Sequence, residues 1–161
     1  MTTLLDVMVY ICQHYPRKDD LSTSRLTKMI YLADWRGAID LDRPVTNTVW
    51  LYGFYGPDTV NVVNAARANP SLFSVRLVPN AYSGPKEVIA LKPRARPPQL
   101  GSEDRRILDI VIHTTLNMNW AELVRFVYST YPMLSQQRGS VLPLRKLARE
   151  YKKAKSDLVA L

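Results

Sequence analysis

The residues that most often carry metal or redox chemistry are few and scattered in this chain. Metal sites are built from clustered His, Cys and carboxylate ligands, and the sequence contains only His14, His113 and Cys12 of the first two types. Cys12 and His14 are two positions apart, which points their side chains to different sides of a helix. Cys12 is expected to pack as a small apolar side chain. We therefore expect no metal site.

Nucleophilic and phosphate chemistry have no signature here either. A catalytic Ser or Cys needs a base and an orienting acid, and no G-x-S-x-G, G-x-G-x-x-G or P-loop motif occurs. His113 is expected on a helix in a structural role. Asp34, Asp40 and Asp42 could converge on a cation, but solvated loop carboxylates are the simpler interpretation. The sequence thus predicts a protein that is not an enzyme and carries no cofactor.

An aromatic stretch is the first candidate for binding. Residues 48–55 are mostly β-branched or aromatic, which predicts a short strand. Alternation would place Trp50, Tyr52 and Phe54 on one face, as in platforms that stack nucleobases. The stretch holds no Lys or Arg, and large aromatic side chains in a small domain more often form core, so we favour a core role.

Localised positive charge is the second candidate. The formal net charge is +8, and it is concentrated in the middle of the chain and at its carboxyl end. Residues 93–101, rich in Pro and Arg, are expected to form an exposed extended connection, and residues 152–161 form a basic end. The polar face of the last helix suits phosphate contacts or an acidic protein and gives no sign of base reading. Solvation of an outer helix face would produce the same pattern.

These candidates must be positioned by elements that periodicity predicts. Helices are expected at about 3–15, 22–37, 59–68, 102–116, 119–131 and from 143 onward. Strands near 73–77 and 88–91 should form an antiparallel hairpin, joined by the strand around Trp50. The expected fold class is α+β, predominantly α-helical: five or six helices with a small antiparallel sheet inserted in the middle, in a single domain over residues 1–161.

Several local signals set the ends and faces of these helices. Arg25, Lys28 and Arg36 are expected on the outer side of the second helix, and Gly37 is expected to end it or to let the chain turn. Gly56-Pro57 reads as a break before the third helix. The expected helix starts are Thr3, Ser22 or Ser24, Asp58, Ser102 and Asn119.

Membrane insertion is not expected. No apolar run approaches the roughly 20 residues that cross a bilayer, and the amino-terminal stretch lacks the basic start and cleavage site of a signal peptide. We expect a cytoplasmic protein with no membrane partner.

Residues 21–57 carry a pattern that resembles a known family. A helix with the order Leu-x-Lys-x-x-Tyr-x-Ala is followed by a polar loop and an aromatic segment that closes in Tyr-Gly-Pro. This order resembles the Panacea domain of SocA-like and GepA-like antitoxins, and the likeness extends over nearly the whole chain. Many members carry a His near a Pro-Trp pair after the fifth helix, where this chain has Tyr131-Pro132-Met133. The matching residues are Leu26, Lys28, Met29, Ile30, Tyr31, Leu32 and Ala33, then Val49, Trp50, Tyr55, Gly56 and Pro57.

The resemblance implies an antitoxin of a bacterial or phage toxin-antitoxin system, which neutralises a co-encoded toxin by protein–protein contact without catalysis. The expected partner is the cognate toxin, and the expected assembly is a toxin–antitoxin heteromer or a homo-oligomer. Binding of nucleic acid is allowed but is not required for this function. Two alternatives stay open: a nucleic-acid-binding regulator that uses the basic last helix, and a phage-encoded inhibitor or adaptor of a host protein. Candidate contact residues are the members of Tyr31, Asp34, Trp35, Tyr52 and Tyr55 that packing leaves exposed, and Arg145, Arg149 and Lys152 of the last helix.

Overall fold

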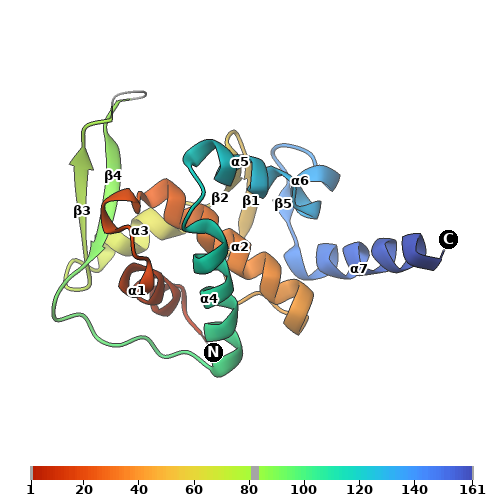
Figure 1. The fold of residues 1–161 in the computed structure, drawn as a ribbon, viewed down its shortest axis with the longest axis horizontal. Coiled ribbons are helices and arrows are strands. Elements are labelled where there is room, and N and C mark those ends of the chain that lie inside the picture. The colour runs from red at the N-terminus through yellow and green to blue at the C-terminus, as the bar shows by residue number, and fades with distance from the viewer. Residues whose placement is uncertain (1, 81–83, 161) are drawn as a thin grey trace.

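The computed structural model describes residues 2–80 and 84–160, and within them the chain is predominantly helical with two small antiparallel sheets. The α+β prediction is confirmed (Figure 1). The described residues form seven α-helices, one more than expected, because a short helix begins at Tyr131 where Pro132 fits the first turn. The helices are α1 (Leu4–His14), α2 (Thr23–Leu41), α3 (Asn61–Ala68), α4 (Ser102–Thr115), α5 (Trp120–Tyr128), α6 (Tyr131–Ser135) and α7 (Leu144–Ala160).

Local capping explains several of these helix starts. Thr3 forms a capping box with Asp6 at α1, Ser22 accepts from the backbone N–H of Arg25 at α2, and Asn119 accepts from that of Glu122 at α5. Two expected caps are wrong. Asp58 lies in a strand and α3 begins later, at Asn61, while Ser102 is the first residue of α4, whose cap position is Gly101.

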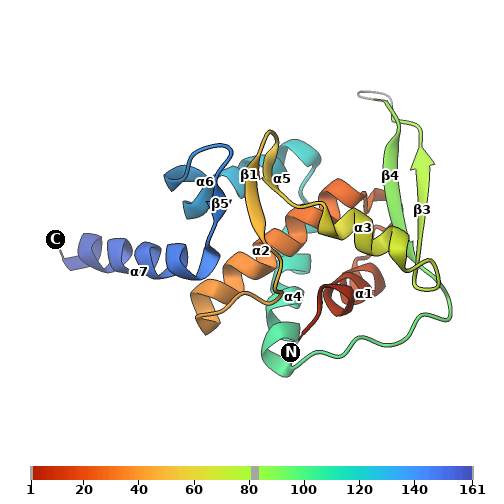
Figure 2. The ribbon, with the colours of Figure 1, turned by 180° about the vertical axis from the view of Figure 1, so that it is seen from behind.

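α2 is the central element, and it lies between α4 on one side and a three-stranded sheet on the other (Figures 1 and 2). The helix does not end at Gly37 as expected but runs on to Leu41. Gly37 instead permits a close approach of the following loop, since a Cβ there would lie 2.9 Å from the carbonyl oxygen of Arg43. Leu26 and Ile30 are fully buried, as the pattern predicted.

The expected single sheet is in fact two. β1 (Trp50–Gly53) pairs with β2 (Gly56–Asp58) and with β5 (Val141–Leu142), whereas β3 (Phe73–Val78) pairs with β4 (Lys86–Leu91). Gly56-Pro57 is therefore part of a strand, because the chain reverses after Gly53 and pairs back on β1. The β3–β4 hairpin instead contacts the start of α2, through a bridge between Ser22 and Val88.

The two charged segments differ in structure. Residues 92–101 have no regular secondary structure and are exposed or half-buried. α7 packs its first half on the body and extends its second half away from it (Figures 1 and 2). Among the described residues, no helix has the length and apolar character to cross a bilayer.

Candidate partner-binding site

One face of α2 holds the three-stranded sheet in place through three polar side chains. Lys28, Tyr31 and Asp34 are spaced three apart, which puts them on neighbouring positions of one helix face. Each reaches a different segment of the chain, and all three are buried. The family-like pattern of this helix is therefore a set of internal contacts.

Asp34 fixes the loop before β1. Its carboxylate accepts from the backbone N–H and the hydroxyl of Thr46, both at 2.7 Å, and from the indole N–H of Trp50 at 2.8 Å. Burial raises the pKa of Asp34 to about 6, although these hydrogen bonds oppose the shift. Because Trp50 is itself only 1% exposed, the contact anchors the first residue of β1 in the core.

Tyr31 connects α2 to the segment after α5. Its hydroxyl shares a hydrogen bond of 2.8 Å with that of Thr130, and its ring meets Trp50 edge-on with centroids 5.5 Å apart. Burial raises the pKa of Tyr31 well above its ordinary range. Tyr31 is thus a buried packing residue and not a surface contact.

Lys28 fixes the turn between β1 and β2 from behind. Its ammonium donates to the carbonyl oxygen of Tyr55 at 3.3 Å and lies 5.2 Å from the ring centroid of Trp120. Burial lowers the pKa of Lys28, and the charge of Asp58 partly offsets this. The expectation that Lys28 faces outward is wrong, because the turn and Trp120 close over it.

The turn itself presents aromatic side chains to solvent. Phe54 and Tyr55 are 73% and 80% exposed and meet edge to face at 5.4 Å. The guanidinium of Arg138 lies 5.3 Å above the ring of Phe54. We call Phe54, Tyr55 and Arg138 the hairpin tip.

The same sheet also exposes apolar side chains on its outer face. Leu51 of β1 and Val141 of β5 are cross-strand partners, and they are 45% and 55% exposed. Tyr52 lies on the opposite face of β1, half-buried, with its ring 6.4 Å from that of Tyr128. The sheet therefore exposes aliphatic side chains in addition to the aromatic and Arg side chains of the hairpin tip.

The basic side chains of α7 are partly neutralised. Arg145 and Arg149 both contact Asp42, with closest N–O distances of 3.0 and 2.6 Å. Their hydrogen bonds, that of Arg149 foremost, hold the pKa of Asp42 well below its usual range. Lys152, one turn further on, is exposed and forms no ion pair with any described residue.

The structure separates the predicted contact residues by exposure. Tyr31, Asp34 and Trp35 are buried at 6% exposure or less, so of these five predicted contact residues packing leaves only Tyr52 and Tyr55 accessible. Sequence reasoning missed Arg138, because nothing near residue 138 indicates contact with a ring 84 positions earlier. Phe54 belongs to the same stretch as Tyr55, but strand alternation predicted that it shares a face with buried Trp50. Because β1 ends at Gly53, Phe54 lies in the turn, where strand alternation no longer applies, and its side chain is exposed.

The three candidate carboxylates do not converge. Asp34 is enclosed by Thr46 and Trp50, Asp40 pairs with Arg36, and Asp42 pairs with α7. Within residues 2–80 and 84–160, no group of three His, Cys, Asp or Glu side chains has the proximity that a metal ion needs.

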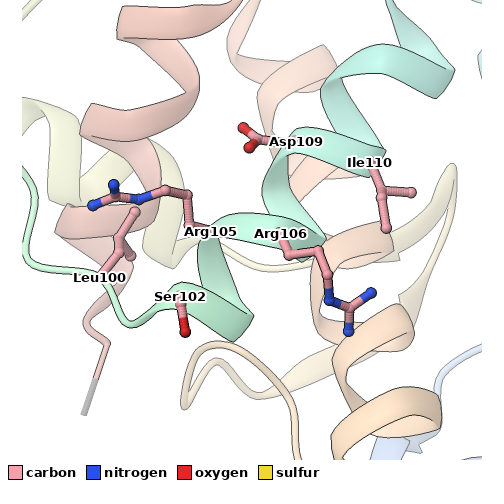
Figure 3. A pocket seen from close by; sticks show the side chains of 6 residues that line it. All are labelled: Leu100, Ser102, Arg105, Arg106, Asp109 and Ile110. Carbon is pink, nitrogen blue, oxygen red and sulfur yellow. The ribbon is translucent and has the colours of Figure 1, made fainter.

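A pocket at the start of α4 is lined by charged side chains. Figure 3 shows that the side chains of Arg105 and Arg106 point in different directions and that Asp109 lies further along the helix. Asp109 accepts from the hydroxyl of Tyr10, and Arg106 lies 3.5 Å from Asp40. Two of the charged groups that line this pocket, Arg106 and Asp109, are thus paired with residues outside it, and the lining side chains do not focus on one point.

The geometry defines a class first: a small, mainly helical domain with exposed aromatic, aliphatic and Arg side chains on its three-stranded sheet. Residues 26–132 match the family model "Antitoxin SocA-like, Panacea domain", and the chain belongs to this family. The match includes α2 from Leu26 onward and the β1–β2 hairpin, whereas α1 and α7 lie outside it. No curated protein and no solved structure matched the chain. Membership in an antitoxin family suggests a role without catalysis.

Proposed function

We propose that this protein is an antitoxin that binds a co-encoded toxin directly and covers its functional surface. Family membership supports the antitoxin role. The structural observation that carries the proposal is the hairpin tip, two exposed aromatic rings and an Arg on a turn that Lys28 fixes from inside. We expect the toxin to be cytoplasmic, as its antitoxin would be.

The composition of the hairpin tip is that of a binding hot spot. Trp, Tyr and Arg dominate the side chains that cost most on truncation, and such residues cluster at interface centres. Trp120, 47% exposed, extends the surface, because the ammonium of Lys28 lies between its ring and the Tyr55 carbonyl. Leu51 and Val141 add apolar area beside it.

Preorganisation strengthens this argument. Binding through a mobile loop requires ordering that loop, which weakens affinity. Here the antiparallel pairing of β1 with β2 and the Lys28 contact already hold the turn. An interface of ordinary size, about 800 Å² on each partner, would be sufficient to block a toxin's active or substrate-binding surface.

The basic helix gives less support to the nucleic-acid alternative. Both of its arginines, Arg145 and Arg149, are directed to Asp42, which reduces the charge available to phosphates. We therefore propose a toxin–antitoxin heteromer as the functional assembly. A phage-encoded inhibitor of a host protein would use the same surface and is distinguished by its target.

Coexpression tests the proposal. The adjacent open reading frame is expressed alone and with this protein, growth is scored, and the complex is isolated through a tag. We expect toxicity alone, rescue on coexpression and a stable complex. A neighbour that is harmless alone, or a rescue without any complex, would overturn the proposed mechanism.

The contact surface is tested with a matched pair of variants. The double substitution Phe54→Ala and Tyr55→Ala should weaken toxin binding at least a hundredfold, since each ring is expected to contribute about tenfold or more. Leu77→Ala is the control, because Leu77 is 68% exposed on the separate β3–β4 hairpin. Equal binding by both variants would exclude the hairpin tip as the contact surface.

A further inference from the structure

Arg138 is a cation that the protein holds in place but does not pair with an acid. Its side chain is exposed, and its guanidinium lies 5.3 Å above the ring of Phe54. Within residues 2–80 and 84–160 it forms no ion pair and no hydrogen bond. Arg145 and Arg149 differ in this respect, because both are directed to Asp42. The N–H donors of the Arg138 guanidinium therefore remain available to a partner.

The loop that carries Arg138 is fixed to β1. The backbone N–H of Gly139 donates to the carbonyl oxygen of Tyr52 at 2.7 Å, and the N–H of Tyr52 donates to the carbonyl oxygen of Ser140 at 2.8 Å. Gly139 has a φ of 90°, a left-handed conformation that glycine adopts without strain. The backbone of Arg138 is thus held by β1 and its guanidinium by the Phe54 ring, which lowers the entropy that binding must cost.

The surroundings of Arg138 define the group that it suits. A guanidinium is a planar fork of donors that matches a carboxylate in a bidentate pair. Phe54 and Tyr55 are exposed beside it, so a partner that covers the hairpin tip removes water from this ion pair and strengthens it. An acidic side chain bordered by apolar side chains is the complement of a cation bordered by aromatic rings.

The charges of the two segments that form this surface do not cancel that of Arg138. Residues 50–58 and 136–140 contain only one other charged side chain, Asp58. Asp58 forms no ion pair with Arg138, and its charge acts instead on the buried ammonium of Lys28. Since Asp58 and Lys28 offset each other, Arg138 is the uncompensated charge of these segments.

We propose that Arg138 forms a bidentate pair with a carboxylate of the toxin, an Asp or Glu side chain within an apolar patch that packs on Phe54 and Tyr55. The proposal rests on the proposed function and names the complementary group for the same surface. The pair fixes the orientation of the toxin, because the planar fork accepts a carboxylate in one geometry.

Nucleic acid fits this surface less well than a protein does. Affinity for nucleic acid comes from several cations along the phosphate chain, whereas these segments present one. Bases stack on open ring faces, but the guanidinium of Arg138 covers one face of Phe54, and the rings of Phe54 and Tyr55 meet at an angle of 67°. A second copy that paired tip to tip would bring two Arg138 side chains together.

The first test measures the affinity of full-length variants for the purified co-encoded toxin. Arg138→Ala should weaken binding about tenfold or more. Arg138→Lys keeps the charge but not the planar fork, so it should restore only part of that loss. Because Arg138 takes part in no internal hydrogen bond among the described residues, both variants should unfold near the wild-type urea midpoint.

Arg94→Ala is the matched control. Arg94 is also exposed and forms no ion pair within the part of the chain that the structure describes. Its segment, residues 92–101, lies on the opposite side of the molecule from the turn between β1 and β2 (Figures 1 and 2). This variant loses the same charge as Arg138→Ala and should bind the toxin like the wild type.

A double-mutant cycle then identifies the carboxylate. Each surface Asp and Glu of the toxin is replaced by Ala, and each toxin variant is titrated against the wild type and against Arg138→Ala. We expect one toxin substitution that weakens binding to the wild type about tenfold and leaves binding to Arg138→Ala unchanged, because the two side chains lose the same interaction.

The outcomes separate this inference from the proposed function. Unchanged toxin affinity for Arg138→Ala, equal affinity for Arg138→Lys and wild type, or a cycle in which no toxin carboxylate couples to Arg138 overturns the inference and leaves the proposed function standing. A wild-type protein that binds no toxin removes both. Normal toxin binding by Arg138→Ala together with the loss of duplex binding or of a dimer assigns Arg138 to nucleic acid or to a second copy and overturns the inference.

Discussion

Replacing Asp34 by Asn should change how the stability of this protein depends on pH. In the folded state the pKa of Asp34 is about 6, against 3.8 for an ordinary Asp. Between these two values the folded state binds a proton that the unfolded state has already released. Stability is therefore lost as pH rises from about 4 to 6 and is level above that. The loss is about 3 kcal/mol, because each pKa unit corresponds to about 1.4 kcal/mol.

The Asp34→Asn variant lacks this charge but has its own defect. One carboxylate oxygen of Asp34 accepts from both the Thr46 hydroxyl and the Trp50 indole, and an amide nitrogen there would leave the indole N–H without an acceptor. A buried unpaired donor costs about 1–3 kcal/mol. The variant should thus be less stable than wild type by that amount at pH 4, and the gap should close toward pH 7.

Urea unfolding at pH 4, 5, 6 and 7 measures this gap, with tryptophan fluorescence as the probe because Trp50 contacts Asp34 directly. The slopes of the transitions should match, so the midpoints compare stabilities. A gap that stays constant or widens as pH rises would refute the reasoning. It would mean that the donors from Thr46 and Trp50 outweigh burial and keep Asp34 ionised at pH 4.

Three further predictions concern other buried contacts. Burial raises the pKa of Asp6, but hydrogen bonds from Thr3, Arg96 and the backbone of residue 99 outweigh it and bring the pKa to about 2. The wild type should therefore lose about 2 kcal/mol of unfolding free energy in urea titrations as pH falls from 4 to 2. The Asp6→Asn variant should not show this loss. Gly37→Ala should destabilise by about 1–3 kcal/mol in thermal or urea unfolding despite the better helix propensity of Ala, because its Cβ would lie 2.9 Å from a backbone oxygen; a stabilised variant would contradict this. Arg25→Met should lower the free energy of unfolding by about 2–4 kcal/mol in the same assay, since Arg25 donates to the carbonyls of Thr115 and Met118 at and just beyond the end of α4. A neutral effect would show that water replaces the guanidinium.

Family membership locates the function, but the structure changes the role of the residues that carry the family pattern. Lys28, Tyr31 and Asp34 attract attention as polar and aromatic residues on one helix, yet each is buried and holds another segment. The surface proposed to bind the toxin lies outside this helix, at the hairpin tip. The helix positions this surface and does not itself offer one.

The sequence by itself determined the features that depend on near neighbours. The starts of α1, α2 and α5 follow from side chains that accept backbone hydrogen bonds three residues ahead, and the buried stripes follow from helical spacing. The fold class and the family pattern could be predicted for the same reason, because both depend on the spacing of residues that are close together in the sequence.

The tertiary structure alone decided which distant segments meet. Residue 50 pairs with residue 142 and not with the β3–β4 hairpin, Lys28 is covered by Trp120, and Arg138 reaches Phe54. No local signal specifies these contacts, because strand partners and the burial of a charge depend on packing summed over the whole chain. For the same reason only the structure showed that α7 leaves the body after Tyr151, so that residues 152–158 are exposed.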